Sequence, residues 1–253
     1  MTAPAALTNT YPSLAGKSVF ITGGATGIGA ELVTAFASQK CKVSFADIDA
    51  QSGSALAEQT DTRFFDCDLR DIGKLDEAIA EAGELDGPIS ILINNAADDT
   101  RHDFREVTEN YWNDRMAVNL RHVFFAIQAA HPQMLRAGGG SIINFGSMSW
   151  YECQGGMAGY TTSKAAIEGL TRGLARDLGA DNIRINTLVP GWVMTPKQKA
   201  LWVGDEVKRE IERGQSLKRE LLPQDICAMA LFLASDDARM CTAQAYIVDG
   251  GWI

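Results

Sequence analysis

Short apolar runs alternate with longer helix-periodic stretches along almost the whole chain, and this alternation limits the fold more than any other feature of the sequence. The runs are nearly continuous in apolar residues, as expected of strands that are buried on both faces. We predict strands at Val19–Thr22, Val43–Ala46, Arg63–Cys67, Ile89–Asn94, Ser141–Phe145, Arg184–Val189 and Ala245–Val248. We predict helices between them, notably at Ile28–Gln39, Leu75–Ala82, Trp112–Leu135, Ala158–Leu178 and Gln224–Ala234. Such alternation forms right-handed βαβ units, so the sequence predicts an α/β fold with a doubly wound, seven-stranded parallel sheet.

The length of the chain predicts one domain, because 253 residues would make two full domains both small. We place this single domain at residues 15–253. Residues 1–14 lack the basic start and the apolar stretch of a signal peptide and are predicted to form a flexible N-terminal arm. Residues 195–222 are charged, interrupt the alternation and follow a predicted strand end, so we predict a helical flap there, close to a ligand site.

The composition excludes several classes of function. A net charge of −9 without any basic run argues against binding to nucleic acid or to an anionic membrane surface. No apolar run reaches the roughly 18 to 20 residues that span a bilayer. The five cysteines form no CxxC pair, which is typical of free thiols in a cytoplasmic protein. The three histidines form no ligand cluster, so we expect no bound metal.

A glycine-rich turn, TGGATGIG, follows the first predicted strand and opens the first predicted helix. The first glycine permits a tight turn, the second a close approach of the backbone to a pyrophosphate, and the third close packing of helix and strand. The N-terminus of the helix offers unpaired N–H groups to phosphates. The turn therefore predicts the dinucleotide-binding loop of a Rossmann fold. Its ligand-facing residues are predicted to be Gly23, Thr26, Gly27, Ile28 and Gly29.

Two acidic residues end the second and third predicted strands. Asp47 is placed to accept hydrogen bonds from the ribose hydroxyls of an adenosine and to repel a 2′-phosphate, and the next residue is Ile48 rather than arginine. We therefore predict NAD as the cofactor. Asp68 and Leu69 are placed to meet the adenine ring. The alternatives are a solvated turn for Asp47 and a helix N-cap for Asp68.

Tyr160 and Lys164 are spaced four residues apart on a predicted helix, so they share one face. A tyrosine has an ordinary pKa near 10, and a nearby ammonium together with an oxidised nicotinamide should lower the pKa of Tyr160 toward that of a useful base. Ser147 lies thirteen residues upstream of Tyr160, just after a predicted strand. Ligands bind at the carboxyl ends of strands in doubly wound sheets, so Ser147 is predicted to reach the same site.

These features, together with Asn119, the sequence NNAA at Asn94–Ala97 and PGWVMT at Pro190–Thr195, stand in the order and spacing of the short-chain dehydrogenase/reductase family. The resemblance spans about Leu14 to Ile253. It implies hydride transfer between a nicotinamide dinucleotide and an alcohol or carbonyl carbon. It also implies that Tyr160 is the acid/base, that Lys164 binds the nicotinamide ribose, that Ser147 orients the substrate oxygen, and that Asn119 holds a water in a proton relay from Lys164.

The same resemblance extends the set of cofactor contacts. It adds Tyr160, Lys164, Asn95, Ala96, Pro190, Gly191, Val193 and Thr195. Val193 and Thr195 are implied to meet the nicotinamide carboxamide. One departure is Ala97, which replaces a glycine usual in the family; its methyl group alters the following loop without affecting the prediction of family.

Further stretches, among them Asp98–His102 and Ile143–Trp150, resemble the subgroup of bacterial NAD-dependent D-xylose 1-dehydrogenases. That resemblance implies oxidation of the anomeric carbon of D-xylose or a related aldose to the lactone. Alternatives are another polyol, a sugar acid, a hydroxysteroid or a 3-oxoacyl thioester as substrate, or a non-catalytic dinucleotide-binding regulator. The residues predicted to contact substrate are Ser147, Trp150, Tyr160 and Trp192, with Arg101, His102, Glu152, Gln154 and Met194 as further candidates. Trp150 could equally pack in the core or at a subunit contact.

The likeness to the family also implies a homotetramer with two-fold interfaces. The helices predicted at Trp112–Leu135 and Ala158–Leu178 would form the larger interface. Trp252 and Ile253 at the end of the chain would pack across another.

Overall fold

The computed structural model describes residues 9–253, and within that range a single parallel sheet organises the chain. Its seven strands lie in the order β3-β2-β1-β4-β5-β6-β7. They are β1 (Ser18–Thr22), β2 (Lys42–Asp47), β3 (Arg63–Asp66), β4 (Ile89–Asn94), β5 (Gly140–Phe145), β6 (Ile183–Pro190) and β7 (Ala245–Val248). The predicted fold class is confirmed. Each predicted strand is present, with ends that differ by about one residue, which is the usual uncertainty of strand ends.

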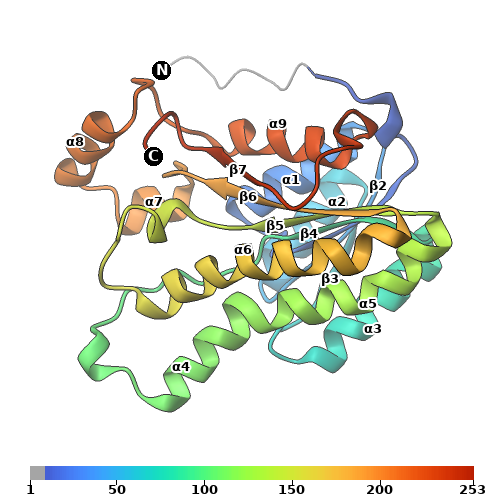
Figure 1. Cartoon of the computed structure of the whole chain (residues 1–253), viewed down its shortest axis with the longest axis horizontal. Coiled ribbons are helices and arrows are strands. Elements are labelled where there is room, and N and C mark those ends of the chain that lie inside the picture. The colour runs from blue at the N-terminus through green and yellow to red at the C-terminus, as the bar shows by residue number, and fades with distance from the viewer. Residues whose placement is uncertain (1–8) are drawn as a thin grey trace.

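Helices cover both faces of the sheet (Figure 1). One layer contains α1 (Gly27–Ser38), α2 (Ala50–Thr60) and α9 (Pro223–Ala234). The other contains α3 (Ile72–Asp86), α5 (His122–Ala137) and α6 (Ala158–Leu178), and is extended by α4 (Glu109–Met116). Among residues 9–253, no helix combines the length and the apolar character needed to cross a membrane.

The core explains why the strands are continuously apolar. Successive side chains of a strand point to opposite faces of the sheet, so Val19 and Ile21 pack toward α1 and α9 while Phe20 packs toward α3. All five residues of β1 are buried. Burying one such side chain stabilises the fold by about 1.5–3 kcal/mol, so neither face of the sheet can be left open to water.

Apart from shifts of a few residues at helix ends, such as the longer α3, the helical prediction differs from the structure in two places. The helix predicted over Trp112–Leu135 is interrupted by a π-helical turn at Ala117–Arg121, which separates α4 from α5. A π-turn adds one residue to the ladder of hydrogen bonds, and apolar periodicity does not reveal it. Helix α2 was not among the predicted helices, because Gly53 is its one buried residue and its apolar face is weak.

The packed chain begins earlier than the predicted boundary at residue 15. Residues 1–8 of the predicted arm lie outside the described residues. Leu14, however, is fully buried in the core, and Tyr11 packs against the same cluster. The backbone N–H of Tyr11 also donates to the Gln39 side chain at 2.9 Å. The boundary therefore needs correction, because Tyr11–Leu14 belongs to the folded domain.

The stretch predicted as a flap contains two helices, α7 (Pro196–Leu201) and α8 (Asp205–Gly214), which project from one side of the sheet (Figure 1). The Thr195 side chain caps α7 by accepting from the Gln198 N–H. The two ends of the stretch are tied together, because Met194 N–H donates to the Leu221 carbonyl at 2.8 Å. The predicted flap therefore forms an excursion whose first and last residues lie side by side at the edge of the domain.

Candidate active site

A cavity of about 920 Å³ opens at the carboxyl ends of the strands. It lies beside the switch point between β1 and β4, where the chain changes its direction of winding and where doubly wound sheets bind ligands. We call the part lined by residues 23–29, Asp47 and Asp68 the glycine end. We call the part whose lining residues come from the segments 97–101, 147–157 and 191–198, though not every residue of these segments lines it, the loop end.

At the glycine end, two glycines allow neighbouring segments to approach within contact distance. A Cβ atom on Gly29 would lie 1.8 Å from the carbonyl oxygen of Gly23. A Cβ on Gly23, which has φ of +68°, would lie 2.7 Å from the Cα of Ala96. The Asn95 amide holds this arrangement by donating to the Gly23 carbonyl at 2.8 Å. The turn is therefore packed against the end of β4, and the start of α1 faces the cavity.

Asp47 is fixed at the rim of the glycine end. One carboxylate oxygen accepts from the Ala25 N–H at 2.9 Å and the other from the Asp49 N–H at 3.1 Å. Ile48 is 66% exposed beside it, although it is a large apolar residue. A fixed carboxylate next to an exposed apolar side chain suits a ribose and the flat face of a base.

Asp68 also lines the glycine end, but its carboxylate is engaged by a neighbour. Arg70 donates to both oxygens of Asp68, at 2.7 to 3.0 Å. The hydrogen bonds from Arg70 hold the pKa of Asp68 below its ordinary value. The N-cap of α3 is Asp71 rather than Asp68, so the helix-cap alternative for Asp68 does not hold.

Ser147, Tyr160 and Lys164 all line the same cavity. Ser147 follows β5 directly, and Tyr160 and Lys164 lie on the first two turns of α6. The Lys164 ammonium is buried and donates to the Phe145 carbonyl at 2.7 Å, and it lies 5.5 Å from the centre of the Tyr160 ring. The Ser147 hydroxyl donates to Ser149 Oγ at 2.9 Å. The structure thus brings together three residues that the sequence separates by up to seventeen positions.

Burial dominates the electrostatics of Tyr160 and Lys164. Burial raises the pKa of Tyr160 to about 12, and hydrogen bonding with Ser147 lowers it only in part. Burial also lowers the pKa of Lys164 to about 7. Burial is the largest cause of both shifts, and the lowering of the Tyr160 pKa by the Lys164 ammonium together with an oxidised nicotinamide stays a prediction.

Asn119 lies in the π-turn and is fully buried. Its side-chain oxygen accepts from the Asp98 N–H at 2.8 Å, and its side-chain nitrogen donates to the Asp98 carbonyl at 3.1 Å. Both functions of the amide are thus committed to the backbone of the loop after β4. One N–H and one lone pair of the amide remain for further hydrogen bonds, so a water held by Asn119 would be bound by these or by its backbone.

The loop end is built from side chains of segments that are far apart in the sequence. Asp99 accepts from Lys197 at 3.1 Å and from Gln198 at 2.7 Å, so the loop after β4 is bound to α7. The Arg101 guanidinium lies 5.0 Å from the centre of the Trp202 ring, which is a cation–π distance. Burial raises the pKa of Glu152, which also lines the cavity.

All predicted cofactor residues line the cavity; they are Gly23, Thr26, Gly27, Ile28, Gly29, Asp47, Ile48, Asp68, Leu69, Asn95, Ala96, Tyr160, Lys164, Pro190, Gly191, Val193 and Thr195. Arg101, Glu152, Gln154 and Trp192 line it as well. Trp150, His102 and Met194 are not among its lining residues. The Trp150 ring packs against Tyr151 instead, with ring centres 3.9 Å apart, so the structure does not support a substrate contact by Trp150.

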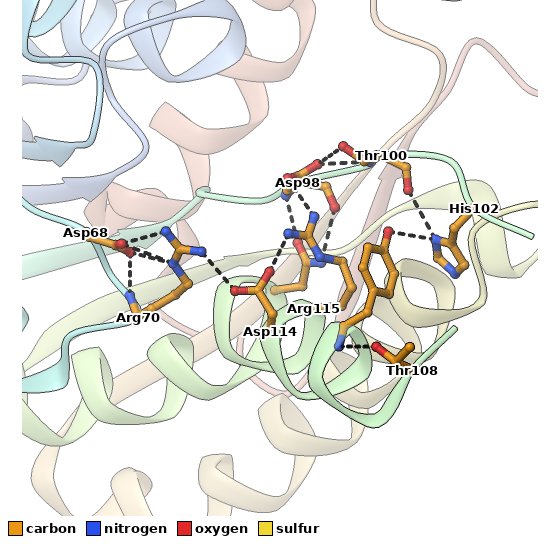
Figure 2. A network of polar contacts seen from close by, with 10 residues as sticks. Asp68, Arg70, Asp98, Thr100, His102, Thr108, Asp114 and Arg115 are labelled. Atoms are coloured by element: carbon orange, nitrogen blue, oxygen red, sulfur yellow. Dashed lines mark hydrogen bonds and ion pairs between the residues drawn. The ribbon is translucent and has the colours of Figure 1, made fainter. Parts of the chain in front are cut away.

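Sequence reasoning missed Asp99, Lys197 and Gln198 as lining residues of the loop end. Ninety-eight positions separate Asp99 from Lys197, and no motif connects them. It also missed the network of ion pairs around Arg115 in Figure 2. Within the described part of the chain, no group of three or more histidine, cysteine, aspartate or glutamate side chains is arranged to hold a metal ion.

The geometry can be compared with known proteins at this point. Residues 23–253 match the family model described as Enoyl-(Acyl carrier protein) reductase. The structure of a 7 alpha-hydroxysteroid dehydrogenase, complexed with NADH and 7-oxo glycochenodeoxycholic acid, superimposes with a TM-score of 0.90 at 31% identity, over 96% of each chain. The chain belongs to the short-chain dehydrogenase/reductase family and is an oxidoreductase.

Among curated relatives, the chain is 45% identical to a D-xylose 1-dehydrogenase of Caulobacter vibrioides, over 96% of this chain and 98% of that one. It is 44% identical to a probable galactose dehydrogenase of Rhizobium meliloti, over 95% of this chain and 96% of that one. Both matches extend through the glycine end and the loop end alike. The predicted resemblance to the family is confirmed.

Proposed function

We propose that this protein is an NAD-dependent aldose 1-dehydrogenase, which oxidises the anomeric carbon of D-xylose or a closely related aldopyranose to the lactone. The observation that carries the proposal is the meeting of Ser147, Tyr160 and Lys164 at a cavity whose loop end is walled by charged and amide side chains. The similarity to a xylose and a probable galactose dehydrogenase supports the choice of substrate class.

The glycine end fits a nicotinamide dinucleotide. The glycine turn presents the N-terminus of α1 to a pyrophosphate, and Asp47 lies where the ribose of the adenosine is expected. Arg70 is the basic residue nearest to Asp68 in the wall, and its guanidinium is already bound by Asp68 and Asp114. A 2′-phosphate would therefore face the Asp47 carboxylate, and the Arg70 guanidinium is already paired, which favours NAD over NADP.

Bound NAD⁺ supplies the acceptor for the hydride that leaves the sugar carbon. The Tyr160 phenol, deprotonated for this step, takes the proton of the anomeric hydroxyl. Ser147 hydrogen-bonds the same oxygen and stabilises it as carbonyl character develops. Lys164 holds the ammonium beside Tyr160, where it favours the phenolate once the site is closed to water.

The loop end favours a sugar over a steroid or an acyl chain. Arg101, Glu152 and Gln154 offer donors and acceptors to hydroxyl groups, and Trp192 offers an aromatic face to the C–H face of a ring. A steroid would require a more continuous apolar wall. Pentose and hexose differ by one hydroxymethyl group, and steric rejection of such a group is worth roughly 10- to 200-fold, so side activity on other aldoses is expected.

The test is the initial rate of NADH formation with D-xylose, L-arabinose, D-glucose, D-galactose and L-fucose. Simple polyols and 3-hydroxyacyl thioesters are measured in the same panel, with NAD⁺ and with NADP⁺. The proposal expects the highest kcat/KM with an aldose and NAD⁺. A polyol or thioester that exceeds every aldose would overturn the substrate and leave the family intact.

The proposed functional unit is a homotetramer in the cytoplasm. Trp112 on α4 and Phe124 on α5 are 37% and 40% exposed, so two large apolar side chains are available on the helices expected at the larger interface. Size-exclusion chromatography with light scattering tests the assembly, and a monomer at assay concentration contradicts it.

A further inference from the structure

One residue that belongs to none of the sequence motifs, Arg115 on α4, lines the cavity and connects three parts of the active site. Its side chain is 12% exposed, and the guanidinium donates to a carboxylate oxygen of Asp98 at 2.6 Å. Its other terminal nitrogen donates to Asp114. Figure 2 shows Arg115 between these two carboxylates. A guanidinium can bind two carboxylates at once, whereas a lysine ammonium cannot reproduce this geometry.

Asp98 is the residue whose backbone the Asn119 amide holds on both sides. The Asp98 carboxylate also accepts from the Thr100 N–H at 2.9 Å and from the Thr100 hydroxyl at 2.6 Å. Burial alone would raise the pKa of Asp98, but the hydrogen bonds from Thr100 and Arg115 outweigh it and hold the pKa below its ordinary value. Asp98 thus stays ionised and fixes the start of the loop that lines the cavity.

The aliphatic part of Arg115 reaches the helix that carries Tyr160. A Cβ atom built on Gly159 would lie 3.2 Å from Cβ and 3.3 Å from Cγ of Arg115, so the two residues are in close contact. Gly159 directly precedes Tyr160 in the first turn of α6. The central carbon of the guanidinium lies 5.2 Å from the centre of the Tyr111 ring, which is a cation–π distance.

A second connection runs in parallel with this one. His102 Nε2 accepts from the Gly159 N–H at 3.3 Å, and its Nδ1 lies 3.1 Å from the Tyr111 hydroxyl and 3.2 Å from the Thr100 carbonyl. The loop at Asp98–His102 is therefore bound to the first turn of α6 through His102. It is bound to α4 through Arg115 (Figure 2).

We propose that Arg115 is a positioning residue for the reaction: by holding Asp98 and packing on Gly159, it fixes the loop at 98–102, and with it the Asn119 turn, relative to Tyr160. Arg115 lines the cavity, but in this role it acts through Asp98 and Gly159 rather than by contact with substrate or cofactor. Displacing reacting groups by about 1 Å costs roughly 100-fold in rate, so a residue that sets this spacing affects kcat without contacting the substrate.

The experiment compares Arg115→Met, Arg115→Lys and Asp98→Asn in the full-length protein with the best substrate of the panel. We expect Arg115→Met to lower kcat by about 10- to 100-fold while the Kd for NADH changes by less than about twofold, because Asp114 and Asp68 still pair with Arg70 at the glycine end. Arg115→Lys keeps one ion pair with Asp98 and should recover part of kcat. Arg115→Met combined with Asp98→Asn should be no slower than the slower single variant, because both changes break one interaction.

Arg105→Met is the matched control, since Arg105 also pairs with an aspartate, Asp103, but is 72% exposed. It should leave kcat unchanged. The inference rests on the catalytic role proposed above for Tyr160, so Tyr160→Phe is measured alongside. If Tyr160→Phe is active, the proposed mechanism is wrong. If Tyr160→Phe is inactive but Arg115→Met, Arg115→Lys and Asp98→Asn all keep wild-type kcat, the mechanism stands and the inference about Arg115 is wrong. Equal losses of NADH affinity, kcat and melting temperature also overturn it, because they indicate a general structural defect. If Arg115→Met does not fold, Arg115→Lys and Asp98→Asn decide the outcome.

Discussion

The glycine end and the loop end of the cavity are held in place by different kinds of contact. At the glycine end, backbone atoms lie so close together that a single Cβ atom on Gly29 would come within 1.8 Å of a neighbouring carbonyl. At the loop end, the segments are joined by side chains, such as the contacts of Asp99 with Lys197 and Gln198. The first arrangement tolerates almost no substitution, whereas the second can be rebuilt one contact at a time. A shared family with different substrates is the expected result.

The largest effect is expected where the two ends meet, at Tyr160. Tyr160→Phe removes the acid/base hydroxyl and little volume, so kcat should fall by roughly 100- to 10,000-fold or more. The Kd for NADH, measured by fluorescence, should stay within about twofold, because the glycine end does not depend on the hydroxyl. Near-wild-type turnover would contradict the proposed role of Tyr160.

The same residue predicts a pH dependence of oxidation. The pKa of Tyr160 is raised to about 12 in the protein alone, so the phenolate is scarce at neutral pH. The positive charge of NAD⁺ lowers that pKa, but the phenolate fraction still rises as the pH increases toward it. The kcat/KM for oxidation should therefore increase on the alkaline side. A profile that is flat or falls with pH would exclude Tyr160 as the base.

The next effect tests the glycine end by itself. Gly29→Ala forces a methyl group against the Gly23 backbone, and the turn must shift to relieve the contact. NADH affinity should fall by about 100-fold or more, or the domain should lose stability, because a misplaced turn no longer faces the pyrophosphate. Gly73→Ala on α3 is the matched control, since its Cβ would meet only Asp71 Oδ1 at 3.4 Å. The control should bind NADH normally and gain up to about 1 kcal/mol of stability.

This contrast between the two ends also explains what could be predicted from the sequence. The glycine turn, Asp47, Ser147, Tyr160 and Lys164 are recognisable because their roles depend on their place next to a strand end or on one helix face. All of them line the cavity. The contacts of Asp99 depend instead on how the loop after β4 packs against a helix after β6. The spacing of residues in the sequence does not predict this tertiary contact.

Two other features were hidden for related reasons. The π-turn at Ala117–Arg121 leaves the apolar pattern of the helix unchanged, so the sequence could not show that Asn119 is turned toward Asp98. Trp150 lies three residues after Ser147, yet the short helical turn at Met148–Trp150 directs its ring against Tyr151. Closeness to Ser147 in the sequence therefore did not predict a substrate contact for Trp150, because the backbone turns within those three residues.

A smaller effect is expected from the cofactor rim. Asp47→Ser removes the carboxylate that would repel a 2′-phosphate while keeping a hydroxyl for the ribose. The ratio of kcat/KM for NAD⁺ to that for NADP⁺ should fall by about 10- to 100-fold, as expected for loss of one charge interaction in a partly shielded site. Equal use of both cofactors by the native enzyme would show that Asp47 does not face the ribose.

The smallest effect is expected at the loop end, where Asp99 binds α7. Asp99→Asn removes the ion pair with Lys197, whose side chain is 56% exposed, and weakens the hydrogen bond from Gln198. Exposed ion pairs contribute about 0.2–1 kcal/mol, which corresponds to no more than about a fivefold change. The flap should then stay closed over the substrate for a smaller fraction of the time. We expect the KM for the sugar to rise by about two- to fivefold while the Kd for NADH is unchanged.

Lys199→Met is the matched control, because Lys199 pairs with Glu220 inside the flap itself and not with the loop after β4. The Asp99 carboxylate also raises the pKa of Tyr160, so the alkaline limb of the Asp99→Asn profile should move to lower pH, which a change in flap closure alone would not cause. An unchanged KM in Asp99→Asn, or an equal rise in Lys199→Met, would show that the contact between Asp99 and α7 does not control access to the loop end.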